Sequence, residues 1–189
     1  MRVIAGAAGG LRLLVPKQGV RPTMDRVKAA IFSSLGDRTI DARVLDLFAG
    51  TGGLGIEALS RGARSALFVD NQRSAVTTIE KNLAISKVTA RVRLQDVFDF
   101  LGHTTARSEF DVIFADPPYE QSPSGERFTS KLLTDNYLPQ LLAPGGVLIL
   151  EKRPAEVVED FPFWSIQRAK TYGATEVLFL EAANFPRSA

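Results

Sequence analysis

Residues 44–55 read VLDLFAGTGGLG, an apolar run that leads into a turn of closely spaced glycines. Such a stretch is typical of a β-strand that ends in a tight turn and continues as a helix. The glycines permit the turn because they tolerate backbone conformations that side chains disfavour. On both sides the sequence alternates between strand-like and helix-like segments, which predicts an α/β fold with a mainly parallel sheet.

This alternation predicts seven strands. They cover residues 43–48, 65–70, 89–95, 110–115, 146–151, 163–169 and 175–181. The helices expected between them cover about 53–61, 72–86, 97–102 and 129–142, with a further candidate at 154–160. Only five residues separate the last two strands, which is too few for a crossover helix, so we expect these strands to pair antiparallel.

The first 43 residues are predicted to form an N-terminal extension. Short β-type runs at 3–5 and 11–15 are separated by glycines, which predicts a hairpin. Thr23 can cap a helix that ends at Leu35, because Gly36 follows where a helix-terminating glycine is favoured. We therefore divide the chain into an extension over residues 1–43 and a sheet domain over residues 44–189.

The extension carries more than the whole excess of positive charge. The net charge of the chain is +2, whereas residues 1–43 hold eight Lys and Arg against three Asp and Glu. Lys and Arg that face phosphates release condensed counterions, so this segment is a candidate contact for a polyanion. A solvated basic face is the alternative interpretation.

The composition excludes several classes of site. The chain has no cysteine and one histidine among 189 residues, which excludes a disulfide framework, a Cys-ligated metal and a cysteine nucleophile, and we expect no metal. No apolar run approaches the ~18 residues of a membrane span, and the first residues lack the pattern of a signal peptide. We expect a cytoplasmic protein without a membrane partner.

Acidic residues at the expected strand ends indicate the ligand of the glycine turn. Asp70 follows Gly50 by twenty residues and can accept hydrogen bonds from ribose hydroxyls, which predicts an adenosine-containing ligand. Asp46 suits the ammonium of S-adenosylmethionine better than it suits a nicotinamide cofactor. Asp96 can accept from an adenine amino group. A structural glycine turn and solvated strand-end aspartates are the alternatives.

Asp116-Pro117-Pro118-Tyr119 follows the fourth expected strand. The prolines have no backbone N–H and hold the chain extended, so the carbonyls there are available to a ligand. An exocyclic amine on a purine is a poor nucleophile because its lone pair is delocalised. Hydrogen bonds from this amine to the Asp116 carboxylate and the Pro117 carbonyl would direct the lone pair toward a methyl donor. Tyr119 could stack on the base.

Together these motifs resemble the Rossmann-like S-adenosylmethionine-dependent methyltransferases that carry a D/N-P-P-Y signature and modify amino nitrogens. More narrowly, the chain resembles the bacterial RsmD family, which methylates the N2 amine of one guanine in 16S ribosomal RNA. The matching motifs run in order along nearly the full length, at residues 2–6, 21–23, 25–27, 45–55, 116–119 and 172–175. Arg21-Pro22-Thr23 is the family-specific part.

The resemblance implies a class I methyltransferase fold, with a seven-stranded, mostly parallel sheet and helices on both faces. It also implies S-adenosylmethionine as cofactor and 16S ribosomal RNA of the small subunit or an assembly intermediate as partner. We expect a monomer. Asp116, Pro117 and Tyr119 would hold the guanine. Asp70 would bind the cofactor ribose, Asp96 and Val97 the adenine, and Asp46, Gly50 and Gly52 the methionine portion. The expected RNA-facing residues are Arg2, Arg12, Lys17, Arg21, Arg26 and Lys28.

Three other functions stay open at this point. A related enzyme could methylate adenine N6 in DNA or RNA, or a glutamine side chain, although Asp rather than Asn at position 116 argues against a protein substrate. A nicotinamide-dependent oxidoreductase would need a hydride-transfer site, and the sequence has no Tyr-x-x-x-Lys pair. A noncatalytic RNA-binding factor would not need the Asp116–Tyr119 motif. Residues 120–128 are our candidate for a lid over the flipped guanine.

Overall fold

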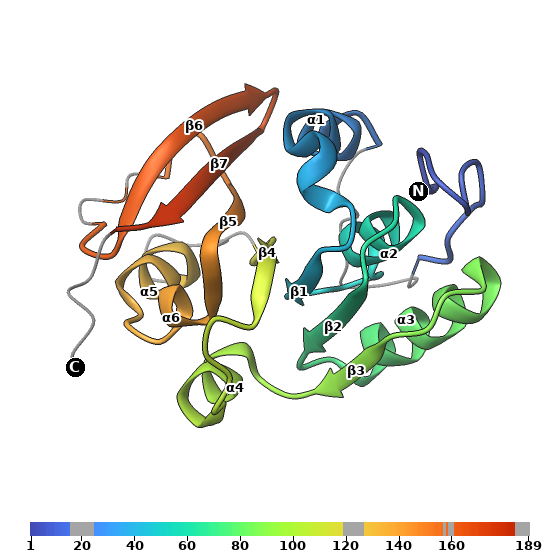
Figure 1. Ribbon diagram of the computed structural model, residues 1–189, viewed down its shortest axis with the longest axis horizontal. Coiled ribbons are helices and arrows are strands. Elements are labelled where there is room, and N and C mark those ends of the chain that lie inside the picture. The colour runs from blue at the N-terminus through green and yellow to red at the C-terminus, as the bar shows by residue number, and fades with distance from the viewer. Residues whose placement is uncertain (16–24, 119–126, 157, 159–160, 184–189) are drawn as a thin grey trace.

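A seven-stranded sheet forms the centre of the protein (Figure 1). The computed structural model describes residues 1–15, 25–118, 127–156, 158 and 161–183. The strands are β1 Arg43–Leu47, β2 Ser65–Asp70, β3 Arg91–Leu94, β4 Phe110–Ala115, β5 Leu142–Lys152, β6 Trp164–Tyr172 and β7 Thr175–Ala182. Across the sheet they lie in the order β3-β2-β1-β4-β5-β7-β6. The strand order reverses at β1, which lies between β2 and β4.

The predicted α/β class and the mostly parallel sheet are confirmed. The pairs β1 with β2, β1 with β4, β2 with β3, and β4 with β5 are parallel. The last strand, β7, lies between β5 and β6 and is antiparallel to both. The predicted antiparallel pairing of the last two strands is therefore also confirmed.

Two layers of helices cover the sheet, one on each face. Successive side chains of a strand point to opposite faces, so the buried strands present apolar residues to both layers. Val44 and Phe68 belong to one core cluster, which also includes apolar residues of the first three helices. Leu45 and Val69 belong to the other, which includes residues of the later helices. The first layer holds α1 Asp25–Leu35, α2 Gly53–Ser60 and α3 Arg73–Ser86, and the second holds α4 Val97–His103, α5 Phe128–Thr134 and α6 Leu138–Leu141.

The prediction of one helix over 129–142 is wrong, since two short helices occupy this stretch. Asp135 ends α5 and its carboxylate accepts hydrogen bonds from the backbone N–H groups of Tyr137 and Leu138, at 2.8 and 2.7 Å, where α6 begins. Strand β5 starts at Leu142, four residues before its predicted start, because Leu142 already pairs with Phe110. The predicted helix at 154–160 is absent from the described residues there.

Residues 1–15, the N-terminal arm, form the predicted hairpin in reduced form. An antiparallel bridge joins Arg2 to Arg12, and Val3 N–H donates to the Leu11 carbonyl at 2.9 Å. Val3 and Leu13 are buried in the first core cluster, beside residues of α1. The arm therefore packs on the sheet domain. The 3₁₀ helix η1, Gly36–Thr39, follows α1, and Gly36 takes the positive φ of 53° expected of a helix-terminating glycine. The cap predicted at Thr23 lies outside the described residues.

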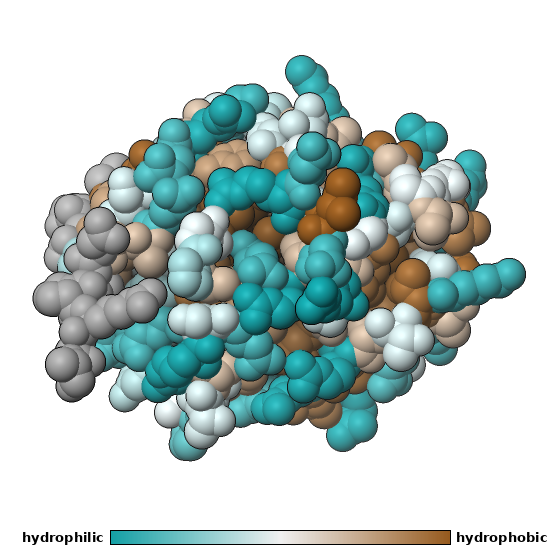
Figure 2. Space-filling model, viewed as in Figure 1, coloured by the Kyte–Doolittle hydropathy of each residue, from teal (hydrophilic) through white to brown (hydrophobic). Residues whose placement is uncertain are grey.

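Hydrophilic residues cover most of the face viewed in Figure 2, and apolar residues are visible there in small areas between them. Across the part of the chain that the structure describes, no helix is long and apolar enough to cross a membrane.

Candidate active site

The predicted site residues gather at the carboxyl edge of the sheet. Leu47 of β1 lies in register with Val69 of β2 and with Ala115 of β4. The residues that follow these positions, Asp70 and Asp116 among them, therefore lie along one edge. Because β1 is where the strand order reverses, this edge is also where open α/β sheets bind their ligands.

The glycine loop, residues 49–55, connects β1 to α2 in the way the sequence predicts. Gly52 has a φ of 75°, a left-handed conformation that other residues adopt at a cost. At Gly55 the constraint is space, since a Cβ there would lie 2.4 Å from the ring of Phe68. The Gly55 N–H instead donates to the carboxylate of Asp46 at 2.8 Å. This buried contact ties the strand to the first turn of the helix.

Asp70 fixes the start of the same loop. Its carboxylate accepts hydrogen bonds from the N–H groups of Gly50 and Gln72, each at 2.8 Å. Asp70 is 8% exposed, so these contacts hold its carboxylate at the end of β2 beside the loop. The structure thus brings Asp46, Gly50, Gly52 and Asp70 together.

Asp96 has a structural role at the start of α4. Its side chain caps α4 by accepting from the N–H groups of Phe98 and Asp99, at 2.8 and 3.2 Å. Capping a helix in this way stabilises it by about 1 kcal/mol. The Val97 side chain is buried in the second core cluster with Phe100. A ligand at this position would meet the first turn of α4.

The carboxyl group of Asp46 responds to burial and to the two other aspartates at this edge. Burial raises the pKa of Asp46 to about 8, the Gly55 N–H opposes this rise, and the negative charges of Asp116 and Asp70 add to it. An ion pair with a cation would favour the charged carboxylate. The site is therefore suited to a ligand that brings positive charge.

Asp116 and Pro117 follow β4 at this edge, as predicted. Asp116 is partly buried, Pro117 is buried and Pro118 is exposed. Tyr119 lies outside the described residues, as does most of the candidate lid at 120–128. Strand β5 continues as far as Lys152 at this edge: Glu151 and Lys152 are 3% and 6% exposed, and Lys152 pairs with Glu176 at 2.6 Å.

Three phenylalanines at the same edge were not among the predicted site residues. The rings of Phe98 and Phe128 are stacked with centroids 6.1 Å apart, and Phe48 meets both rings edge-on. All three are half-buried. The ammonium of Lys131 lies 3.8 Å from the Phe98 ring centroid. Their positions in the sequence could have indicated a site, because Phe48 directly follows β1 while Phe98 and Phe128 lie in the first turns of α4 and α5.

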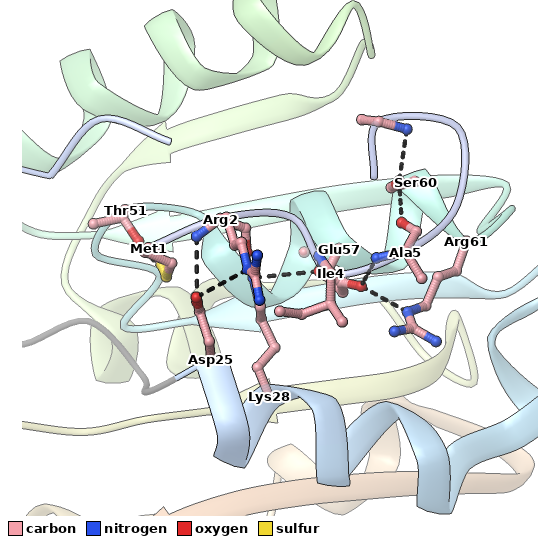
Figure 3. Close-up of polar contacts among 12 residues, drawn as sticks. Met1, Arg2, Ile4, Ala5, Asp25, Lys28, Thr51, Glu57, Ser60 and Arg61 are labelled. Atoms are coloured by element: carbon pink, nitrogen blue, oxygen red, sulfur yellow. Dashed lines mark hydrogen bonds and ion pairs between the residues drawn. The ribbon is translucent and has the colours of Figure 1, made fainter. Parts of the chain in front are cut away.

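The predicted RNA-facing residues divide into three groups. Arg2, Arg12 and Arg26 are exposed. Lys17 and Arg21 lie outside the described residues. The prediction for Lys28 is wrong: its side chain is fully buried and pairs with the carboxylate of Glu57 at 3.3 Å (Figure 3).

The described residues include no group of three His, Cys, Asp or Glu side chains that could hold a metal ion. His103 is exposed at the end of α4, and its Nδ1 lies 2.8 Å from the Asp99 carbonyl oxygen, one helical turn earlier. This contact accounts for the position of the histidine.

The family model described as Conserved hypothetical protein 95 matches residues 1–181, nearly the whole chain. The chain belongs to this family, the RsmD family. A relative within it, Ribosomal RNA small subunit methyltransferase D of Escherichia coli K12, is 36% identical over 176 residues, which cover 92% of this chain and 85% of the relative. YlbH of Bacillus subtilis is 40% identical over 183 residues, covering 94% and 96%.

Solved structures agree with this membership. The Escherichia coli protein yhhF superimposes with a TM-score of 0.79 at 34% identity, over 97% of this chain and 99% of that one. The RsmD resemblance seen in the sequence, the Rossmann-like fold and the methyltransferase class are therefore confirmed.

Proposed function

We propose that this member of the RsmD family transfers a methyl group from S-adenosylmethionine to the N2 amine of a guanine in 16S ribosomal RNA. The observation that carries the proposal is the position of Asp116 and Pro117. They directly follow β4, the strand beside β1, and Asp116 lies close enough to Asp46 to raise the pKa of the Asp46 carboxyl group. An amine held by Asp116 would therefore lie beside the cofactor site.

The donor set fits this cofactor. S-adenosylmethionine supplies an electrophilic methyl group on a sulfonium and also carries an ammonium. The buried Asp46 and the neighbouring Asp70 match these positive charges. Asp46, Gly50 and Gly52 would hold the methionine portion, Asp70 the ribose, and Asp96 with Val97 the adenine.

Asp116 and Pro117 act on the guanine. The Asp116 carboxylate and the Pro117 carbonyl oxygen accept the two N2 protons, which directs the nitrogen lone pair toward the methyl group. As the new N–C bond formed, the S–C bond would break and release S-adenosylhomocysteine, and N2 would pass one proton to the Asp116 carboxylate or to water. Tyr119 stacks on the base, and Phe98 and Phe128 add flat apolar surface at the same edge.

The N-terminal arm and α1 supply the contact to RNA. Arg2 and Arg12 are brought together by the bridge between them, and Arg26 is exposed on α1. Phosphate contacts of this kind position a nucleic acid, while the pocket selects the base. Because a stacked guanine cannot reach the methyl group, the base must be flipped out. We infer a monomer that works in the cytoplasm on the small ribosomal subunit or a precursor.

Product analysis tests the proposal. The protein is incubated with labelled S-adenosylmethionine and either naked 16S RNA, assembled small subunits or DNA, and the modified nucleoside is identified by mass spectrometry. We expect N2-methylguanosine from one of the RNA substrates. N6-methyladenine, or label in protein alone, would overturn the assignment.

A further inference from the structure

Asn82 on α3 joins the N-terminal arm to the glycine loop. Its side chain is fully buried. The Oδ1 atom accepts from the Leu14 N–H at 2.8 Å, and Nδ2 donates to the carbonyl oxygens of Leu14 at 3.1 Å and Thr51 at 2.9 Å. One amide group therefore satisfies the backbone of two segments that are 37 residues apart in the chain.

Met1 makes a second contact between the arm and the loop. Its sulfur lies 3.8 Å from the Thr51 hydroxyl, and a Cβ added at Gly53 would lie 2.7 Å from that sulfur (Figure 3). The start of the arm thus packs directly on the residues where the loop becomes α2. A displacement of the arm would change the surroundings of Thr51 and Gly53 together.

The arm is also anchored to α2 itself. The buried carboxylate of Glu57 accepts from the N–H groups of Ile4 and Ala5 at 2.7 and 3.1 Å (Figure 3). Lys28 pairs with this carboxylate and donates to the Arg2 carbonyl. These contacts therefore hold residues 2–5 against α2, the helix that begins at the glycine loop.

We propose that Asn82 is a positioning residue that couples RNA binding by the arm to cofactor binding by the glycine loop. The inference rests on the proposed function, because Arg12, two residues before Leu14, is one of the expected RNA contacts. RNA bound at Arg12 would hold Leu14, and through Asn82 the Thr51 carbonyl, in the arrangement that the cofactor meets. Linkage then requires each ligand to tighten the binding of the other by the same factor.

The coupling factor is measured directly. The affinity for radiolabelled S-adenosylhomocysteine is determined by equilibrium dialysis, without RNA and with saturating 16S RNA transcribed in vitro. In the wild-type protein we expect RNA to tighten binding about fivefold or more, the lower end of typical coupling. In Asn82→Leu, which removes all three hydrogen bonds, we expect the ratio of the two affinities to fall close to one.

A matched control separates coupling from general damage to α3. Ser86 lies one turn further along this helix, is buried, and has a hydroxyl with no hydrogen-bond partner among the described residues. Ser86→Ala should keep the wild-type ratio. A purely structural role of Asn82 would weaken both affinities equally and leave the ratio unchanged, and that result would overturn the proposal.

Two further measurements apply if Asn82→Leu does not fold. Asn82→Asp keeps the acceptor for the Leu14 N–H and removes both donors, so it should also lower the ratio. In the wild-type protein, hydrogen exchange at residues 49–55 should slow when RNA alone is added, and unchanged exchange contradicts the coupling.

The proposed function has its own readout, the formation of N2-methylguanosine. If the wild-type protein methylates the RNA but binds S-adenosylhomocysteine equally well with and without RNA, the coupling alone is disproved. Protein that neither binds nor methylates the RNA disproves both proposals.

Discussion

The charge of Asp46 depends strongly on its surroundings. Its carboxyl group is buried, and burial, with the charges of Asp116 and Asp70, raises its pKa from 3.8 to about 8. Between these values the folded protein binds more protons than the unfolded chain. Its free energy of unfolding therefore falls as pH rises through this range, and Asp46 contributes at most about 1.4 kcal/mol per pH unit.

The variant Asp46→Asn should remove this contribution, because an amide does not titrate. We expect its free energy of unfolding, measured by urea denaturation from pH 5 to 8, to decline less with pH than that of the wild-type protein. Asp99→Asn, which changes an exposed carboxylate on α4, should keep the wild-type slope. Equal slopes for Asp46→Asn and wild type would show that Asp46 is charged throughout the range.

Asp116 should be needed for methyl transfer and not for cofactor binding. In Asp116→Ala the amine loses a charged acceptor in the transition state, and we expect kcat to fall about 100-fold or more. The affinity for S-adenosylhomocysteine, measured by calorimetry, should stay close to that of the wild-type protein. Asp99→Ala serves as control with unchanged kcat. Substantial methylation by Asp116→Ala would rule out the amine-holding role.

At the residue scale, sequence reasoning located the acidic groups because strand ends and glycine spacing are local patterns. Asp46, Asp70 and Asp116 lie at one edge because parallel strands end there. The hydrogen bonds of Asp70 to Gly50 and of Asp96 to α4 depend on exact backbone positions, which spacing does not determine. Lys28 was misassigned because its partner, Glu57, lies 29 residues away on another helix.

At the scale of elements, a buried ion pair between Lys28 and Glu57 joins α1 to α2. Burial lowers the pKa of Lys28, while the neighbouring Glu57 carboxylate opposes this effect. Lys28→Met would leave that buried carboxylate with Arg61 as its remaining cationic partner in the described residues, at 2.7 Å. We expect the free energy of unfolding to fall by about 3–5 kcal/mol in urea denaturation, the usual effect of breaking a buried pair.

Arg26→Ala is the matched control on the same helix. Arg26 is exposed, so its removal should change stability by no more than about 0.5 kcal/mol. The reverse pattern, with Lys28→Met stable but weak in RNA binding, would restore the original assignment of Lys28 as an RNA contact.

Elements with a strong pattern were predictable, and short ones were not. The regular spacing of apolar residues in α2, α3 and the buried strands is visible in the local sequence. The predicted bounds of these elements therefore lie close to those observed. The division of 129–142 into α5 and α6 depends on one capping residue, Asp135. The early start of β5 depends on its pairing with β4, and the local sequence of β5 does not predict this long-range contact.

At the scale of the whole molecule, the asymmetric charge should appear as a salt dependence of RNA binding. Replacing Arg12 by Ala should reduce the slope of log affinity against log salt concentration by about 0.7 to 0.9 for one lost phosphate contact. The measurement is a series of filter-binding titrations with 16S RNA. Lys170→Ala, an exposed cation on the edge strand β6, should leave the slope unchanged. An unchanged slope for Arg12→Ala would place the RNA elsewhere.

The position of β7 has a consequence for biosynthesis. Since β7 lies between β5 and β6, the edge of β5 lacks its neighbour until residues 175–182 have left the ribosome. Strands β6 and β7 are adjacent in the chain and can pair first as a hairpin, which then docks on β5. Until then the nascent protein exposes an open strand edge of the kind that promotes aggregation. A ribosome stalled before residue 175 would therefore hold a sheet that is open at β5.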